Sequence, residues 1–375
     1  MWNNIIGQER VKKILKTMYS SGRIPHSFIF HGTEGTGKDA AAIEFAKLVN
    51  CDDPDADAGS CGNCRSCRQI NSLTSVNFRY IMALPSGKTE IENGEDKAGS
   101  DKDDGDIFSS ELKKKFNDPY YRISIPKAKT IKIESIRQIK NDIYYTVQKG
   151  KKKTFIISNA EQMSTEASNS FLKILEEPPG DALLILTTSK PNSLLPTITG
   201  RCQKIKFETL NNEELGNFIL KNYPDVGDEE RTLLVNLSNG SLTMLKSIIE
   251  NNLMALRDKV IDHLRSLIAN NYLRLSQIIS EITADKDREF VRQYLNLMVL
   301  WFRDLAVQKS GNEELLINRD KTENVNNFLN RFDCNEYEII NMLESFISDI
   351  DKNVNLELML YTLSYDIRPL IRNLQ

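Results

Sequence analysis

A glycine-rich loop between an apolar run and a helical stretch constrains this chain more than any other feature. Residues 28–40 read FIFHGTEGTGKDA, which fits the phosphate-binding pattern G-x-x-x-x-G-K-[ST] except at its last position. The glycines let backbone N–H groups approach a polyphosphate, and the lysine reaches its terminal phosphates. The positions expected to contact nucleotide phosphates are Gly32, Gly35, Thr36, Gly37, Lys38 and Asp39.

The last of these positions departs from the pattern, because Asp39 stands where Ser or Thr is expected. A hydroxyl group there would be placed on Mg²⁺, whereas a carboxylate repels phosphates unless a metal ion lies between them. We therefore expect a nucleotide-hydrolysing scaffold whose chemistry has been given up. The loop is compatible with bound ATP or ADP but is poorly suited to Mg²⁺.

The chain has 375 residues, which is long enough for two or three domains. Its formal net charge of -3 argues against a protein that coats DNA by bulk positive charge. No run of 18 apolar residues is present, and the first ten residues lack the pattern of a signal peptide. We expect a soluble, cytoplasmic protein.

Five short apolar runs in the first half of the chain predict the strands of a parallel sheet that is covered on both faces. Helical stretches fall between these runs, including residues 38–49 directly after the glycine loop, so the expected fold class is α/β with flanking helices. The predicted strands are residues 27–30, 78–84, 154–158, 183–188 and 203–207.

One stretch interrupts this alternation. Residues 86–106 consist mainly of Asp, Glu, Lys, Gly and Ser, and such a segment cannot bury enough apolar surface to offset the cost of ordering it. We expect a flexible insertion inside the first domain, extending over residues 86–118.

From residue 211 onward the pattern is helical, with no further strong strand. Asn211 begins a predicted helix with acidic residues in its first turn. The densely apolar residues 294–308 predict a helix that is buried over most of its circumference. The expected domains are an α/β domain over residues 1–208, a small helical lid over 209–250 and an all-α domain over 251–375.

Four cysteines lie close together in the sequence, with the spacing C-x9-C-x2-C-x2-C. They are Cys51, Cys61, Cys64 and Cys67. Two-residue gaps let neighbouring thiolates converge on one ion, and four thiolates complete a tetrahedral Zn²⁺ shell. Because no activating carboxylate accompanies them, we predict a structural zinc module over residues 51–67. The alternative is four reduced cysteines on loop and helix surfaces.

The phosphate loop and the cysteine module, together with SFLKILEEPP (170–179) and TITGRCQ (197–203), resemble the bacterial clamp-loader subunits of DNA polymerase III, which are AAA+ proteins. The resemblance is strong to about residue 250 and weaker beyond it. It implies an AAA+ domain with a zinc module, a helical lid and, over 251–375, a helical collar for oligomerisation. The partners it implies are gamma/tau-like and delta-like subunits, the sliding clamp and primer–template DNA reached through the complex, with no role for a membrane.

That family contains motor subunits, gamma and tau, and a relative called delta-prime that is usually catalytically silent. The motors carry Asp-Glu after an apolar strand, where this chain has Ser158 and Asn159. They also carry a lid arginine that touches the phosphates, at the position of Thr243. Together with Asp39, three parts of the hydrolytic apparatus are altered, so Thr187, which matches a residue near the γ-phosphate, would be vestigial.

Arg201 is retained at the position from which the family donates an arginine to the ATP of a neighbouring subunit. Such an arginine stabilises charge on the transferring phosphoryl group and can be worth about 10³–10⁵ in rate. The resemblance therefore favours a delta-prime-like subunit that lacks ATPase activity, presents Arg201 in trans and helps to load the clamp onto primed DNA. A surface arginine at a strand start is the structural alternative.

Two other functions stay open at this point. One is an active gamma-like ATPase that uses Asp39 as an unusual metal ligand. The other is a zinc-dependent DNA-binding module in which the lysines of residues 149–153 and 204–206 contact phosphates.

Overall fold

The protein is described by a computed structural model that covers residues 2–55, 57, 59–85, 102–125, 128–145, 150–250, 253–284, 288–350, 352 and 354–374. The chain forms two compact units. The first comprises Met1–Pro224 and Ser238–Leu245, and the second comprises Asp225–Leu237 and Lys246–Gln375. The segment expected to form a lid, residues 209–250, is thus shared between the two units.

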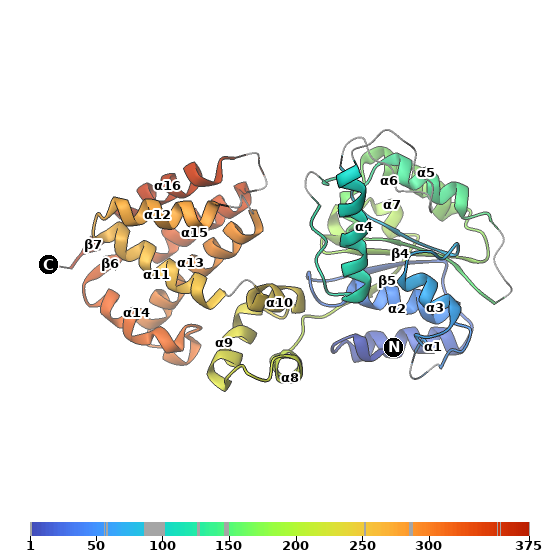
Figure 1. The fold of residues 1–375 in the computed structure, drawn as a ribbon, viewed down its shortest axis with the longest axis horizontal. Coiled ribbons are helices and arrows are strands. Elements are labelled where there is room, and N and C mark those ends of the chain that lie inside the picture. The colour runs from blue at the N-terminus through green and yellow to red at the C-terminus, as the bar shows by residue number, and fades with distance from the viewer. Residues whose placement is uncertain are drawn as a thin grey trace. The chain divides into compact units, whose positions relative to one another are not determined.

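A five-stranded parallel sheet is the framework of the first unit (Figure 1), with the strand order β2-β3-β4-β1-β5. Its strands β3 and β4 are buried at every position, as continuous apolar runs require. All five predicted strands are confirmed, with ends that differ by at most a few residues. The strands are β1 Ser27–His31, β2 Phe78–Ile81, β3 Lys153–Ile157, β4 Ala182–Thr188 and β5 Gln203–Lys206.

Helices cover both faces of this sheet. Successive side chains of a strand point to opposite faces, so neighbouring residues of β1 pack against different helices. Phe28 of β1 packs edge-on against Phe45 of α2, with ring centroids 5.9 Å apart. Ile29 joins a separate buried cluster that contains Ile139 of α5 and Phe171 of α6. The helices of this unit are η1 Trp2–Asn4, α1 Glu9–Ser20, α2 Lys38–Asn50, α3 Arg65–Asn71, α4 Lys102–Asn117, α5 Ile133–Asp142, η2 Ala160–Gln162, α6 Thr165–Glu176, η3 Pro191–Ser193, α7 Pro196–Thr199 and α8 Asn212–Asn222.

Helix α4 lies within the segment that was expected to be a flexible insertion. Residues 86–101 of that segment are outside the described residues, but Lys102–Asn117 is helical. Leu112 and Phe116 are buried, and the Phe116 ring packs edge-on against Tyr80 of β2 at 5.6 Å. Composition misled here because two apolar residues at helical spacing are enough to attach a polar helix to the sheet.

The second unit is mainly helical. Its longest helix, α13, buries Tyr294, Met298 and Phe302, which confirms the prediction for that stretch. The helices that follow α8 are α9 Asp228–Ser238, α10 Leu242–Glu250, α11 Leu253–Ile268, α12 Tyr272–Thr283, α13 Arg288–Lys309, η4 Glu313–Leu315, η5 Arg319–Lys321, α14 Thr322–Leu329, α15 Glu336–Asp349, α16 Leu356–Ile367 and η6 Arg368–Leu370. Among the described residues, no helix is both long and apolar enough to cross a membrane.

The expectation of an all-α C-terminal region needs one correction. Strands β6 Phe332–Cys334 and β7 Ile371–Asn373 pair antiparallel and form a two-stranded sheet. Each strand has three residues, which is too short for the period-two alternation that identifies a strand in a sequence.

Candidate phosphate-binding and metal sites

The glycine-rich loop connects β1 to α2 in the first unit. Gly35 and Gly37 have φ values of 77° and 95°, a conformation that favours glycine. The N–H groups of the first turn of α2 have no acceptor within the helix, and the positive end of the helix dipole lies at the same place. The loop therefore has the geometry of a phosphate cradle.

Lys38 points back onto this loop. Its Nζ donates hydrogen bonds to the carbonyl groups of Gly32 at 2.8 Å and Thr33 at 2.6 Å. Burial lowers the pKa of Lys38, and the charges of Asp39 and Glu34 oppose that change. The lysine is thus placed inside the loop, as the motif predicts, with the loop's own carbonyl groups as its partners.

Asp39 is the centre of a polar network. Its carboxylate accepts hydrogen bonds from the hydroxyl groups of Thr187 at 2.7 Å, Tyr80 at 3.1 Å and Ser158 at 3.2 Å. Lys115 of α4 places its Nζ 3.0 Å from the same carboxylate. These four partners come from β4, β2, the end of β3 and α4, so one side chain joins four elements.

The network fixes the charge of the Asp39 side chain. Burial acts to raise its pKa, but the Lys115 ammonium, the Thr187 hydroxyl and the Lys38 charge outweigh burial and lower this pKa. Burial and the Asp39 charge raise the pKa of Tyr80 well above its ordinary value. At neutral pH the carboxylate is therefore ionised, and the phenol keeps the proton that it donates.

The end of β3, where an active relative was expected to carry Asp-Glu, is followed by Ser158 and Asn159 and carries no carboxylate. Ser158 donates to Asp39, and the N–H of Asn159 donates to Thr187 Oγ1 at 3.4 Å. Glu161, a little further along, accepts hydrogen bonds from the N–H and the hydroxyl of Ser189 at 3.2 and 3.0 Å. Ser158 and Asn159 thus supply no carboxylate pair for Mg²⁺, and Glu161 is bonded to Ser189 through one oxygen while its other oxygen, Oε2, is buried without a hydrogen-bond partner among the described residues.

The segment that contains Thr243 packs against the phosphate loop. The N–H of Leu242 donates to the carbonyl of Gly35 at 3.1 Å, and the Thr243 hydroxyl donates to the carbonyl of Tyr120 at 2.8 Å. A Cβ atom at Gly35 would clash with the Ser241 side chain. The expected lid position therefore lies beside the loop, and its threonine is hydrogen-bonded to the protein itself.

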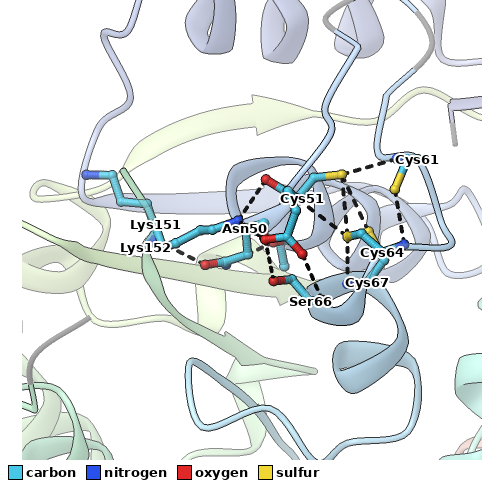
Figure 2. Close-up of polar contacts among 10 residues, drawn as sticks. Asn50, Cys51, Cys61, Cys64, Ser66, Cys67, Lys151 and Lys152 are labelled. Carbon is cyan, nitrogen blue, oxygen red and sulfur yellow. Dashed lines mark hydrogen bonds and ion pairs between the residues drawn. The ribbon is translucent and has the colours of Figure 1, made fainter. Parts of the chain in front are cut away.

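Four cysteine sulfur atoms converge near the C-terminal end of α2 (Figure 2). All four lie within 4.8 Å of one another, and Cys51 Sγ is 3.9 Å from Cys64 Sγ and 3.7 Å from Cys67 Sγ. Tetrahedral coordination with Zn–S bonds of about 2.3 Å places sulfur atoms about 3.8 Å apart, whereas a disulfide places them about 2.0 Å apart. The arrangement fits four thiolates around one zinc ion, and it brings together every cysteine predicted for the module.

Backbone N–H groups are directed at these sulfur atoms. The N–H of Cys61 donates to Cys51 Sγ at 3.3 Å, that of Cys64 to Cys61 Sγ at 3.3 Å and that of Cys67 to Cys64 Sγ at 3.4 Å. Hydrogen bonds to the charged form favour that form, so the local backbone supports thiolates.

Lys151 attaches this cysteine cluster to the residues that precede β3. Its Nζ contacts the Asp52 carboxylate at 2.6 Å and donates to the carbonyl groups of Asn50 at 2.7 Å and Cys51 at 2.8 Å (Figure 2). An ammonium group has three donors, and all three are used. Lys153, two residues on, is buried. Lys151 is therefore engaged within the protein. Lys204 and Lys206, by contrast, are exposed and Lys149 lies outside the described residues, so the DNA-binding alternative stays a prediction.

Arg201 lies just after α7, with its side chain 40% exposed. One guanidinium nitrogen is 3.1 Å from Glu176 Oε1 at the end of α6, and the other donates to the carbonyl of Thr197 at 3.1 Å. Its own carbonyl accepts a hydrogen bond from the Ser27 hydroxyl at 2.9 Å. The backbone of Arg201 is thus fixed to β1, while its side chain remains accessible.

Sequence reasoning did not identify Lys115 and Tyr80 as part of this site. Lys115 belongs to the segment that was taken as a flexible insertion, and Tyr80 belongs to a strand whose residues were read only as core. The sequence held only an indirect signal for Lys115, because a partly buried carboxylate at position 39, which is 19% exposed, favours a cationic partner.

A comparison with protein-family models shows the family of this chain. The family model described as "DNA polymerase III, delta subunit" matches residues 7–211. The chain is 27% identical over 319 residues to DNA polymerase III subunit delta' of Bacillus subtilis, which covers 85% of this chain and 83% of the relative.

Motor subunits also match, over shorter regions. Identity to subunit tau of Bacillus subtilis is 26%, covering 57% of this chain and 30% of the relative. Identity to subunit gamma of Buchnera aphidicola is 27%, covering 66% of this chain and 57% of the relative. The chain thus spans most of the delta' relative and less than two thirds of these tau and gamma relatives. Among solved structures, a gamma subunit-related protein from Thermotoga maritima has a TM-score of 0.47 at 15% identity, covering 96% of this chain and 98% of that one.

Proposed function

The chain belongs to the DNA polymerase III delta-subunit family, and from this membership we propose that it is a delta-prime-like subunit of the clamp loader. In this proposal it is an AAA+ protein that helps to load the sliding clamp onto primed DNA, together with gamma/tau-like and delta-like partners. The observation that carries the silent, delta-prime-like assignment is the Asp39 network, in which the position that binds Mg²⁺ through a hydroxyl in active phosphate loops is an ion-paired carboxylate.

Phosphoryl transfer needs a divalent cation that bridges the β- and γ-phosphates and a residue that orients the attacking water. Here the carboxylate beside the loop is already bonded to Lys115 and to three hydroxyl groups. Ser158 and Asn159 cannot replace the missing carboxylate pair. These features support a subunit without ATP hydrolysis of its own.

Two further functional assignments belong to this proposal. The cysteine cluster holds one structural zinc ion, which is supported by the sulfur–sulfur distances. Arg201 is presented to the nucleotide of a neighbouring subunit, which is supported by its exposed side chain and its anchored backbone. A subunit that cannot hydrolyse ATP can use a catalytic arginine only on the nucleotide of a partner.

One specific observation favours the gamma-like alternative. The loop glycines and Lys38 retain the geometry of a phosphate cradle, so an active enzyme would have to recruit Asp39 as a metal ligand. That role requires the carboxylate to release at least one of its present partners.

Steady-state ATP hydrolysis by the purified chain distinguishes these functions. We expect no turnover that depends on Lys38, because the metal-binding carboxylates are absent and Asp39 is ion-paired. Lys38→Ala is the control, since it removes any activity of this loop but not that of a contaminant. A rate of about 1 s⁻¹ or more, within the ordinary range of enzymes, that disappears in Lys38→Ala would support the active ATPase instead.

A further inference from the structure

Lys115, the cationic partner of the partly buried Asp39, is buried. The Lys115 side chain is 8% exposed, and its Nζ lies 3.0 Å from Asp39 Oδ2 and donates to the carbonyl of Tyr121 at 3.0 Å. Lysine is almost never fully buried unless its charge is paired. Neighbouring lysines on α4 differ from Lys115, since Lys113 is exposed and Lys114, which pairs with the buried Glu111, is 56% exposed.

Asp39 and Ser158 mark where a metal ion would lie. In phosphate loops the residue after the lysine binds Mg²⁺, and the residue at the end of the second motif's strand binds the same ion. Ser158 Oγ and Asp39 Oδ2 are 3.2 Å apart, so the two positions adjoin here as well. The Lys115 ammonium reaches that same Asp39 oxygen.

We propose that the Lys115 ammonium is a built-in cation that takes the place of the divalent metal beside the phosphate loop and attaches helix α4 to that loop. The inference deepens the proposed silent site and relies on the proposed function only for recognising the loop. It is tested by metal binding and stability rather than by hydrolysis, so the two can fail separately.

The hydrogen bonds that Asp39 accepts support this assignment, because they use the capacity of its carboxylate. An ionised carboxylate offers about four lone-pair sites. Three hydroxyl groups and one ammonium group, from Thr187, Tyr80, Ser158 and Lys115, donate to it. A divalent cation would have to displace one of these donors, and it would also be repelled by the ammonium group.

The attachment of α4 follows from the same contact. Removing one member of a buried ion pair leaves the other charge without compensation, whereas removing both charges is often nearly neutral. Phe116, next to Lys115, packs against Phe78 and Tyr80 of β2. The ion pair and these aromatic contacts therefore hold the same turn of α4 against the sheet.

The test uses the full chain and four variants. Lys115→Met removes the ammonium with little change in side-chain length, Asp39→Asn removes the opposing charge, and a double variant removes both. Lys113→Met changes an exposed lysine on the same helix and is the matched control. Mn²⁺ binding is measured by electron paramagnetic resonance without chelator, and thermal unfolding is measured with and without Mn²⁺.

We expect the original chain and Lys113→Met to show no Mn²⁺ site that depends on Asp39. Lys115→Met should bind Mn²⁺ at least tenfold more tightly than the original chain and unfold at a higher temperature when Mn²⁺ is added. Without Mn²⁺, Lys115→Met and Asp39→Asn should each lower the unfolding temperature. The double variant should lower it by less than the sum of these two decreases.

Three results would overturn the proposal. The first is additive losses in the two single variants, and the second is a Lys115→Met variant that resembles Lys113→Met in both stability and Mn²⁺ affinity. The third is a Mn²⁺ site in the original chain that Asp39→Asn removes. This last comparison requires no change at Lys115, so it decides the question even if Lys115→Met fails to fold.

Discussion

In each unit, one titratable side chain that is bonded to several elements has its protonation state set by its surroundings. In the first unit the ionised Asp39 side chain joins three strands to α4. In the second unit His263 has the opposite character, since its ring is buried and bonded to Tyr294 at 2.8 Å and to Ser364 at 2.9 Å. The Ser364 hydroxyl donates to the carbonyl of Leu360, so its oxygen accepts from His263 Nε2–H. Nδ1 then accepts the Tyr294 proton, and the ring is neutral.

This geometry predicts a pH dependence of stability. Burial lowers the pKa of His263 to about 4, while an unperturbed histidine has a pKa of about 6.5. Between these values the unfolded chain binds a proton that the folded chain does not. The stability contribution is therefore complete above about pH 6.5 and falls as the pH drops toward 4, by roughly 3 kcal/mol at most.

The measurement compares the original chain with His263→Gln in urea unfolding at pH 7, 6 and 5. A Trp2→Phe background leaves Trp301, buried in the second unit, as the only tryptophan and hence the reporter. We expect the difference in unfolding free energy between the two proteins to shrink as the pH falls. An unchanged difference from pH 7 to pH 5 would show that His263 titrates equally in both states.

At the scale of elements, the cysteine cluster makes a direct prediction. Cys64 caps α3, and its sulfur accepts a hydrogen bond from the N–H of Cys67, so metal binding and helix capping involve the same side chain. Cys64→Ser should reduce zinc from one ion per chain to none and lower the thermal stability of the first unit. Structural zinc sites in peptides contribute about 10–16 kcal/mol of apparent binding free energy.

Metal analysis by mass spectrometry after purification without chelator checks this expectation. Cys334→Ser is the matched control, because Cys334 is buried in the second unit whereas the cluster belongs to the first. This variant should keep its zinc. A chain that contains no zinc before any substitution would rule out the zinc module.

Sequence patterns predicted the elements that carry local signals. The apolar strands β1 to β5, the glycine loop and the helix start at Asn211 all follow from the residues within each element. The capping box between Asn211 and Glu214 is formed as its residues suggest. Helix α4 and strands β6 and β7 were missed, because they depend on contacts with partners that lie elsewhere in the chain.

The candidate site was likewise predictable only where its residues lie close together in the sequence. The cysteine spacing alone predicted four converging sulfur atoms, because all ligands lie within one short segment. The motif showed that Asp39 is unusual, but its partners Lys115 and Thr187 are distant in sequence, and only the folded sheet brings them to it. A tertiary ion pair leaves no periodic signal, so the sequence indicated a lost metal function and not the cation that replaces it.

At the scale of the whole molecule, the proposed function is that of a chain with a phosphate loop on a parallel sheet but without the groups that hydrolyse ATP. The family match and the similarity to a delta' subunit over most of its length support a clamp-loader subunit, and the Asp39 network is what supports the loss of hydrolysis. Within a complex, such a chain would contribute structure and a single catalytic arginine.

Reconstitution of the clamp-loader complex with Arg201→Ala tests this central claim most directly. Arg201→Lys should restore little of the ATP hydrolysis that Arg201→Ala loses, because lysine lacks the planar guanidinium group that pairs with two phosphate oxygens. Arg137→Ala, on the exposed face of α5, is the matched control. The measurements are assembly, DNA-stimulated ATP hydrolysis and clamp loading.

We predict that Arg201→Ala assembles normally but slows hydrolysis at the partner site that faces it by about 10³-fold or more, with clamp loading reduced accordingly. Arg137→Ala should change neither rate. Normal hydrolysis and clamp loading in an assembled Arg201→Ala complex would contradict the account, since the chain would then supply no catalytic group to its partner.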